Sequence, residues 1–131
     1  MPIEHRIDRE RRVVFAAGHG VFSDQDVFEY QRGVWSDPSL VGYDEVVDMS
    51  DVTEVSMPSA MRARDLAVVA ARMDSPGTAS RLAIVAPADF AYGLARMYAS
   101  YRALQQEGTK TVRVFRAMDE AIAWLEGRLT E

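Results

Sequence analysis

The residues best suited to bind an anion lie between positions 56 and 64. Ser56 and Ser59 carry hydroxyls, and Arg62 and Arg64 follow at once in what reads as the first turns of a helix. Free backbone N–H groups and the helix dipole favour negative charge at the N-terminus of a helix. Arginines in the first turns are unfavourable with respect to this dipole, and a bound anion would compensate for them. This set predicts a site for an anion or a lipid headgroup, or phosphorylation of Ser56 or Ser59.

A purely structural role explains the same residues. Ser56 can cap the helix by accepting a hydrogen bond from a free backbone N–H. Pro58 fits the first turn, where its missing donor costs nothing. Arg62 and Arg64 can pair with Asp65 or face solvent. We expect Ser56 to be the cap of a helix over residues 58–73.

Histidine is the next residue type that could act chemically. His19 stands between Gly18 and Gly20, so its backbone can approach a ligand closely, although a plain turn between strand and helix explains it as well. The other histidine, His5, is distant in sequence, and no cysteine or metal-ligand spacing accompanies the pair. We therefore expect no metal and no cofactor.

Acidic residues concentrate between positions 44 and 54. Paired carboxylates can bind magnesium or act as acid and base, but these are spread over a strand and a loop without a nucleophile or a glycine-rich phosphate loop. We expect an exposed acidic rim made of Asp44, Glu45, Asp48, Asp51 and Glu54. No Ser-His-Asp spacing or nucleotide-binding fingerprint occurs, so we expect a protein that is not an enzyme.

Composition narrows the function further. The 131 residues match one domain, and the net charge of −5 disfavours a nucleic-acid binder. No apolar run reaches the length of a membrane helix or forms a signal peptide, so we expect a cytoplasmic protein without integral membrane association. Only one of the 15 basic residues, Lys110, is a lysine, a bias typical of GC-rich bacterial genomes.

Hydrophobic periodicity predicts the elements that position these residues. Strands are expected within residues 3–7, 13–17, 44–49, 82–86 and 112–115, and helices near residues 23–35, 58–73, 89–107 and 118–129. Because crossover connections are nearly always right-handed, the last three strands should be parallel, with the opening hairpin adding an antiparallel edge. The predicted order is ββαβαβαβα in one α/β domain.

The third predicted helix carries two sets of side chains. Its apolar stripe should face the core and consists of Phe90, Leu94, Met97, Tyr101 and Leu104. Aromatic side chains, methionine and arginine are enriched at interface centres, which makes this helix a candidate contact surface. The candidate interface residues are Tyr92, Gly93, Arg96, Met97, Tyr98 and Arg102. Packing against the sheet is the alternative role for them.

The stretch VVDMSDVTEVSMPSAM, residues 46–61, resembles the signature region of STAS domains, the bacterial anti-sigma-factor antagonists. In that family a strand ends in Asp-x-Ser-x-Val, which Asp48, Ser50 and Val52 match. The next helix begins with Asp-Ser-Ser-Gly, whose first serine is phosphorylated by a partner kinase. Residues 56–59 stand there, and Met57 at the acceptor position has no hydroxyl.

The Gly18 turn and the ALARM-like segment at residues 93–97 are similar to the SpoIIAA-like subfamily, whose fold resembles lipid-binding CRAL-TRIO domains. The resemblance implies a single STAS-like domain over residues 1–131, with a mixed sheet of about five strands and four helices. It implies a non-enzymatic bacterial regulatory or protein-protein interaction module that acts on a protein partner or as a homodimer. The alternative is a carrier of a small anionic or lipid-like ligand in a cavity between helices and sheet.

Overall fold

The computed structural model describes residues 3–56, 59–74 and 77–127. The order ββαβαβαβα is confirmed, with a short 3-10 helix, Pro38–Leu40, before the third strand. The strands are β1 Ile3–Asp8, β2 Val13–Ser23, β3 Asp44–Ser56, β4 Ser80–Val85 and β5 Lys110–Phe115. The helices are α1 Asp24–Val34, α2 Ala60–Met73, α3 Asp89–Ala103 and α4 Met118–Leu125.

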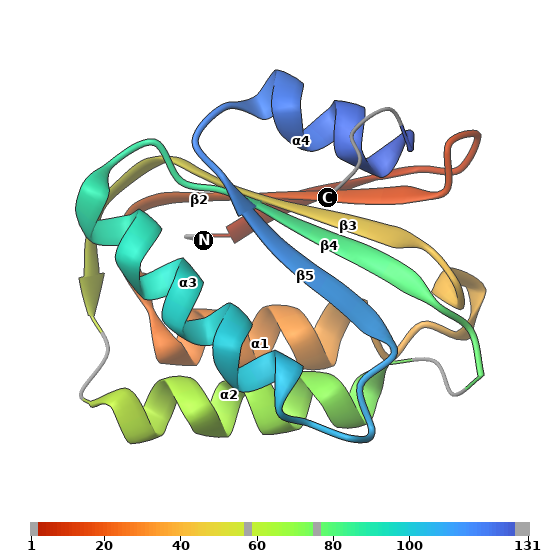
Figure 1. Ribbon diagram of the computed structural model, residues 1–131, viewed down its shortest axis with the longest axis horizontal. Helices are drawn as coiled ribbons and strands as arrows, with labels where there is room; N and C mark the ends of the chain where they lie inside the picture. The colour runs from red at the N-terminus through yellow and green to blue at the C-terminus, as the bar shows by residue number, and fades with distance from the viewer. Residues whose placement is uncertain (1–2, 57–58, 75–76, 128–131) are drawn as a thin grey trace.

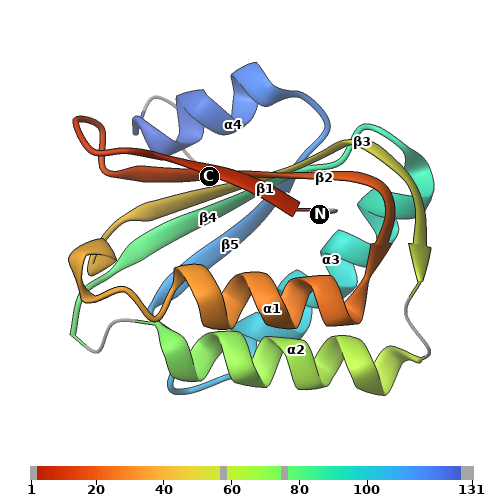
Figure 2. The same ribbon diagram turned by 180° about the vertical axis from the view of Figure 1, so that it is seen from behind.

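The five strands form one mixed sheet in the order β1-β2-β3-β4-β5. The hairpin strand β1 is antiparallel to β2 at one edge, and all the other neighbours are parallel, as predicted. Helices α1, α2 and α3 cover one face of the sheet, and α4 covers the other (Figures 1 and 2). No helix in the described part of the chain is long and apolar enough to cross a membrane.

The two faces of the sheet bury separate cores. Leu82 and Ile84 of β4 face α1–α3, whereas Ala83 and Val85 face Trp124 of α4. Successive side chains of a strand point to opposite faces, and both faces here are covered, which explains why β4 is apolar throughout. Strand β4 thus belongs to both cores.

Strands β2 and β3 are longer than predicted. Beyond Gly18 and Asp48 they pair with each other and with no other described strand, as a two-stranded ribbon made of residues 19–23 and 49–56. The ribbon curves toward the first turns of α1 and α2 (Figure 2). The predicted turn at Gly18-His19-Gly20 is wrong, because register shifts at this point let the glycines remain within a bent strand.

Gly18 is required for the bend. A Cβ at this position would lie 2.6 Å from Cδ1 of Phe22 and 2.9 Å from Cγ2 of Val52. The Phe22 ring therefore folds back over the backbone of its own strand, in space that a larger residue would occupy. Gly18 thereby helps to direct Phe22 into the core between the sheet and the helices.

The predicted core stripe of α3 is wrong at both of its ends. Phe90 is 43% exposed and Leu104 is 74% exposed. The face that packs on the molecule instead carries Ala91, Ala95 and Arg102. Two alanines allow the helix to lie close to the sheet, and the arginine is tolerated because a buried acid pairs with it.

Candidate functional site

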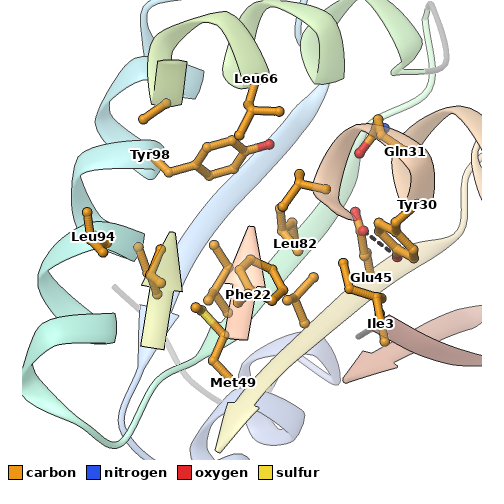
Figure 3. A pocket seen from close by; sticks show the side chains of 17 residues that line it. Ile3, Phe22, Tyr30, Gln31, Glu45, Met49, Leu66, Leu82, Leu94 and Tyr98 are labelled. Atoms are coloured by element: carbon orange, nitrogen blue, oxygen red, sulfur yellow. Dashed lines mark hydrogen bonds between the residues drawn. The ribbon is translucent and has the colours of Figure 1, made fainter. Parts of the chain in front are cut away.

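An apolar cavity lies between the sheet and helices α1, α2 and α3, and we call it the helix-side cavity (Figure 3). Its volume is about 90 Å³, roughly the share of three water molecules in the liquid. Protein interiors contain few voids larger than one water, so this part of the core is incompletely filled. The main apolar lining residues are Phe22, Met49, Leu66, Leu82, Ile84 and Leu94.

The elements around the cavity explain why space remains. Val47, Leu82 and Ile84 form its floor, because alternate residues of β3 and β4 point toward the same face. Helices α2 and α3 contribute alanines, Ala63 and Ala95, at positions where a larger side chain would reach the sheet. Small residues under the helices therefore leave a gap that the apolar neighbours do not close.

A buried polar network stands on the cavity wall around Glu45. The Glu45 carboxylate accepts hydrogen bonds from the Tyr30 hydroxyl at 2.6 Å and from the Trp35 indole N–H at 3.1 Å. Its second oxygen accepts from the Lys110 ammonium at 2.9 Å. Lys110 Nζ also lies 3.2 Å from the centre of the Trp35 ring, a cation–π contact. The only lysine of the chain is thus committed to a buried partner, with 4% of its side chain exposed.

The network fixes the charge of its members. Burial works to raise the pKa of Glu45, but the Lys110 ammonium and the hydrogen bond from Tyr30 outweigh it, so that the pKa is lowered. Burial, together with the negative charge of Glu45, raises the pKa of Tyr30 well above its ordinary value. Glu45 is therefore an anion and Tyr30 a neutral donor at neutral pH.

A second buried ion pair joins α2 to α3. Arg102 Nη2 donates to both oxygens of Asp74 at 2.9 Å, and Arg102 Nη1 donates to the Tyr98 hydroxyl at 3.0 Å. Asp74 also accepts from the backbone N–H groups of Thr109 and Lys110. Burial works to lower the pKa of Arg102, but Tyr98 and Asp74 outweigh it and raise the pKa. This pair ties the end of α2 to the start of β5.

Sequence reasoning missed Glu45 and Lys110, although a signal was present. Lys110 alternates with Val112 and Val114 along β5, and Glu45 alternates with Val47 and Met49 along β3. In a strand this spacing puts all members of each set on one face. The predicted exposed acidic rim is wrong for Glu45, which is 2% exposed, because its pairing with Lys110 allows the carboxylate to be buried.

Two polar groups at the cavity keep unused hydrogen-bonding capacity. Gln31 is 7% exposed, and within the described residues its side-chain amide has no hydrogen-bond partner. The Tyr98 hydroxyl accepts from Arg102, and its own O–H has no acceptor in the part of the chain that the structure covers. Both groups enter the helix-side cavity, from α1 and from α3 respectively (Figure 3).

The predicted anion site is not assembled as expected. Ser56 does not cap α2, since it ends β3, and the cap is Ser59, whose hydroxyl accepts from the Arg62 N–H at 3.3 Å. The guanidinium of Arg62 binds Asp24 at 2.5 Å and is therefore neutralised. Of the two predicted arginines, Arg64 is exposed and has no ion pair among the described residues. Met57 and Pro58 lie outside those residues.

His19 belongs to a different cluster. It lies in β2, and its Nε2 is 3.1 Å from Glu4 of β1 while its Nδ1 is 3.5 Å from Asp51 of β3. The histidine thus bridges two neighbouring strands at the start of the ribbon. Within residues 3–56, 59–74 and 77–127, no group of three or more histidine or acidic side chains could hold a metal ion.

The motif residues of the STAS resemblance also have a local role. The Asp48 carboxylate accepts from the backbone N–H of Ser50 at 2.9 Å and from its hydroxyl at 2.6 Å. Val52 is 5% exposed and packs in the core. These three residues therefore shape the point at which β3 leaves β4 and enters the ribbon.

The candidate interface of α3 divides into buried and accessible residues. Arg102 is 5% exposed in its ion pair with Asp74, so its predicted role in a surface contact is wrong. Tyr98 is directed into the helix-side cavity (Figure 3). The sequence pattern of α3 predicts that Arg102 points outward. In the structure it points inward, because Asp74 at the end of α2 pairs with it.

The other interface candidates remain accessible to some degree. Tyr92 is half-buried beneath Arg116, whose guanidinium carbon is 3.9 Å from the ring centre. Gly93 and Arg96 are exposed, and Met97 is half-buried. A Cβ at Gly93 would have no atom within 4 Å, so no described backbone packs closely there.

Comparison with solved structures finds a protein of similar architecture. It is an uncharacterised protein of the DUF3478 family from Shewanella loihica PV-4, described as having a SpoIIAA-like fold. The two chains share 16% identity and a TM-score of 0.59, over 94% of this chain and 93% of the other. No protein-family model matches the chain, and a search of curated proteins finds no similar sequence. The structural likeness confirms that the chain has a SpoIIAA-like fold.

Proposed function

We propose that the protein is a non-enzymatic binding module that holds a small, largely apolar ligand in the helix-side cavity. The observation that carries the proposal is the cavity itself, about 90 Å³ in volume and lined mainly by apolar side chains. Ligand sites are typically concave, mostly apolar and supplied with a few polar groups. The cavity is smaller than the roughly 150 Å³ engineered cavity that binds benzene, so its ligand is small.

The arrangement of charges supports binding rather than catalysis. A catalytic acid or base must be able to reach a substrate proton. Here Glu45 already accepts from Lys110, Tyr30 and Trp35, and Asp74 is held by Arg102. The charged groups nearest the cavity are thus satisfied by one another.

A ligand-observed NMR screen tests this function. Neutral molecules of about four to eight non-hydrogen atoms, a range set by the cavity volume, are screened against the wild-type chain. Ala95→Leu, which fills the space from α3, is the control, and Ala63→Leu from α2 replaces it if the first does not fold. Binding that disappears in the filled protein supports the proposal. A complete absence of hits, or hits that the filled variant retains, contradicts it.

A second candidate function is recognition of a protein partner at one end of the sheet. Of the five large apolar residues that are exposed in the described part of the chain, three lie at or after the carboxyl ends of parallel strands: Val21 is 50% exposed, Met61 62% and Phe90 43%. These residues belong to the end of β2 and the first turns of α2 and α3. Apolar side chains gathered on one region of a surface favour a contact site.

The partner function has its own test. Replacing Val21, Met61 and Phe90 together by serine should abolish association with a copurified partner, or convert a dimer to a monomer in light scattering. The triple variant should keep ligand binding in the helix-side cavity. A partner or dimer that tolerates all three changes would contradict this candidate function.

A further inference from the structure

We infer that the ligand of the helix-side cavity carries one neutral polar group, a carbonyl or primary amide, which is recognised by Gln31 and Tyr98. The inference rests on the proposed binding function and specifies the chemistry of the ligand. It departs from the anionic ligand expected from the sequence.

The Gln31 side chain makes no hydrogen bond within the described part of the protein. Gln31 is 7% exposed and lines the cavity, and its amide has no partner among the described residues. The amide nitrogen and oxygen are not fully buried, so they reach the accessible space of the cavity and can bond water when no ligand is present. A ligand that replaces this water with matching polar atoms makes the amide a source of affinity and of specificity.

Gln31 and Tyr98 together offer donors and an acceptor to a ligand. The Gln31 amide offers both an N–H donor and a carbonyl acceptor. Tyr98 accepts from Arg102 at 3.0 Å and retains its own O–H as a donor. Figure 3 shows the two groups entering the cavity from opposite sides near Leu82. Two donors and one acceptor match a carbonyl oxygen with an adjacent N–H, as in a primary amide.

The charged side chains near the helix-side cavity are already paired with one another. The Glu45 carboxylate is on the cavity wall, and Lys110 already neutralises it. Arg102, the other buried cation nearby, is held by both oxygens of Asp74. Among the described residues that line the cavity, no cation is available to pair with an anionic ligand, and burying an unpaired charge is very unfavourable. A neutral polar group avoids this penalty.

Propionamide and propionate form a matched pair for the test. Both have about five non-hydrogen atoms, a size that the cavity volume permits with small side-chain adjustments. Binding to the full chain is followed by NMR shifts of the cavity-lining methyl groups, with dissolved xenon as an apolar probe of the same space. We expect propionamide to bind at least tenfold more tightly than propionate at neutral pH.

Variants assign the recognition to the two residues. Gln31→Leu keeps a similar volume without the amide, and we expect it to weaken propionamide about tenfold while xenon binding is unchanged. Tyr98→Phe should weaken it by a smaller factor. Gln25→Leu, an exposed position of the same helix, and Tyr101→Phe, outside the cavity lining, are the controls and should change nothing. Melting curves report whether each variant is folded.

The possible results separate the inference from the function on which it rests. Xenon binding together with equal affinity for the two propionyl compounds, or with no effect of Gln31→Leu, would overturn the neutral-group inference and leave the binding function intact. Failure of xenon and of both compounds to bind would overturn both. Ordered water alone bridging Gln31 and Tyr98 in a structure determined with propionamide would also overturn the inference.

Discussion

On the α4 side of the sheet an apolar core packs around Trp124, whereas the face under α1–α3 holds the helix-side cavity and two buried ion pairs. Val46, Ala83 and Ala121 on the α4 side are 0% exposed. Among the described residues, the four buried polar or charged ones all lie on the α1–α3 side: Gln31, Glu45, Asp74 and Arg102. A close-packed apolar face accounts for stability, and the polar, incompletely filled face is where binding is expected.

The largest expected effect comes from breaking the Glu45–Lys110 pair. Lys110→Met leaves the Glu45 carboxylate buried without its cation, and we expect a loss of about 3–5 kcal/mol in the free energy of unfolding. Chemical denaturation measures the loss. The double variant Glu45→Gln/Lys110→Met should recover part of it, because no unpaired charge remains. A loss below about 1 kcal/mol for the single variant would show that this face tolerates an uncompensated charge.

Two alanine substitutions compare the packing of the faces directly. Ala95 borders the helix-side cavity and Ala121 lies in the α4 core, and both are buried helical residues. Valine at position 121 should cost about 1–3 kcal/mol through overpacking. Ala95→Val should cost less than about 1 kcal/mol, which is close to the intrinsic helix penalty of valine. Equal losses of unfolding free energy in the two variants, measured by thermal or chemical unfolding, would contradict a difference in packing between the two faces.

Substitution of Gly18 tests whether the bend in the ribbon directs Phe22 into the core under α1–α3. Because a Cβ there would lie 2.6 Å from Phe22, we expect Gly18→Ala to destabilise the protein by about 1–2 kcal/mol and to shift the Phe22 ring signals in NMR. Gly33→Ala is the matched control, since nothing lies within 4 Å of its Cβ position in α1. The control should stabilise by about 0.5–1 kcal/mol. An unperturbed Gly18→Ala protein would contradict the role given to the bend.

The smallest expected effect is a change in acid sensitivity. The pKa of Glu45 is lowered in the folded protein from its ordinary value of 4.5. Its contribution to stability is therefore complete above that pH and is lost as the pH falls through the lowered folded pKa. Unfolding free energy measured from pH 6 to pH 2, a window chosen around this titration, should fall less steeply for Glu45→Gln than for the wild type. The same pH dependence of the unfolding free energy in the wild type and in Glu45→Gln would contradict the lowered pKa of Glu45.

The sequence predicted the order of elements because it depends on local periodicity and on turn residues. It did not predict the lengths of β2 and β3, since a bulged strand with Gly18 and Gly20 looks locally like a turn. It also placed both ends of the core-facing stripe of α3 wrongly, at Phe90 and Leu104. The inward position of Arg102 depends on Asp74, which is distant in sequence and near only in the fold.

The candidate site was harder to predict than the fold. Ser59 and Arg62 do lie together, but as a helix cap and an ion pair with Asp24. The cavity forms because small residues on α2 and α3 face strands β3 and β4. This contact joins segments that are distant in sequence, so no local sequence pattern predicts it. Alternation along β5 places Lys110 inward, and only the partner Glu45 makes that position stable.

The most direct test of the account is xenon binding followed by methyl NMR on the wild-type chain. If the helix-side cavity is a true apolar binding space, xenon should shift the methyl signals of Leu66, Leu82 and Leu94, which line it. The methyl groups of Ala83 and Val85, which pack in the α4-side core and line none of the hollows, should not respond. Shifts confined to the α4 side, or no saturable shift anywhere, would contradict the proposal that this protein binds a small ligand beneath α1–α3.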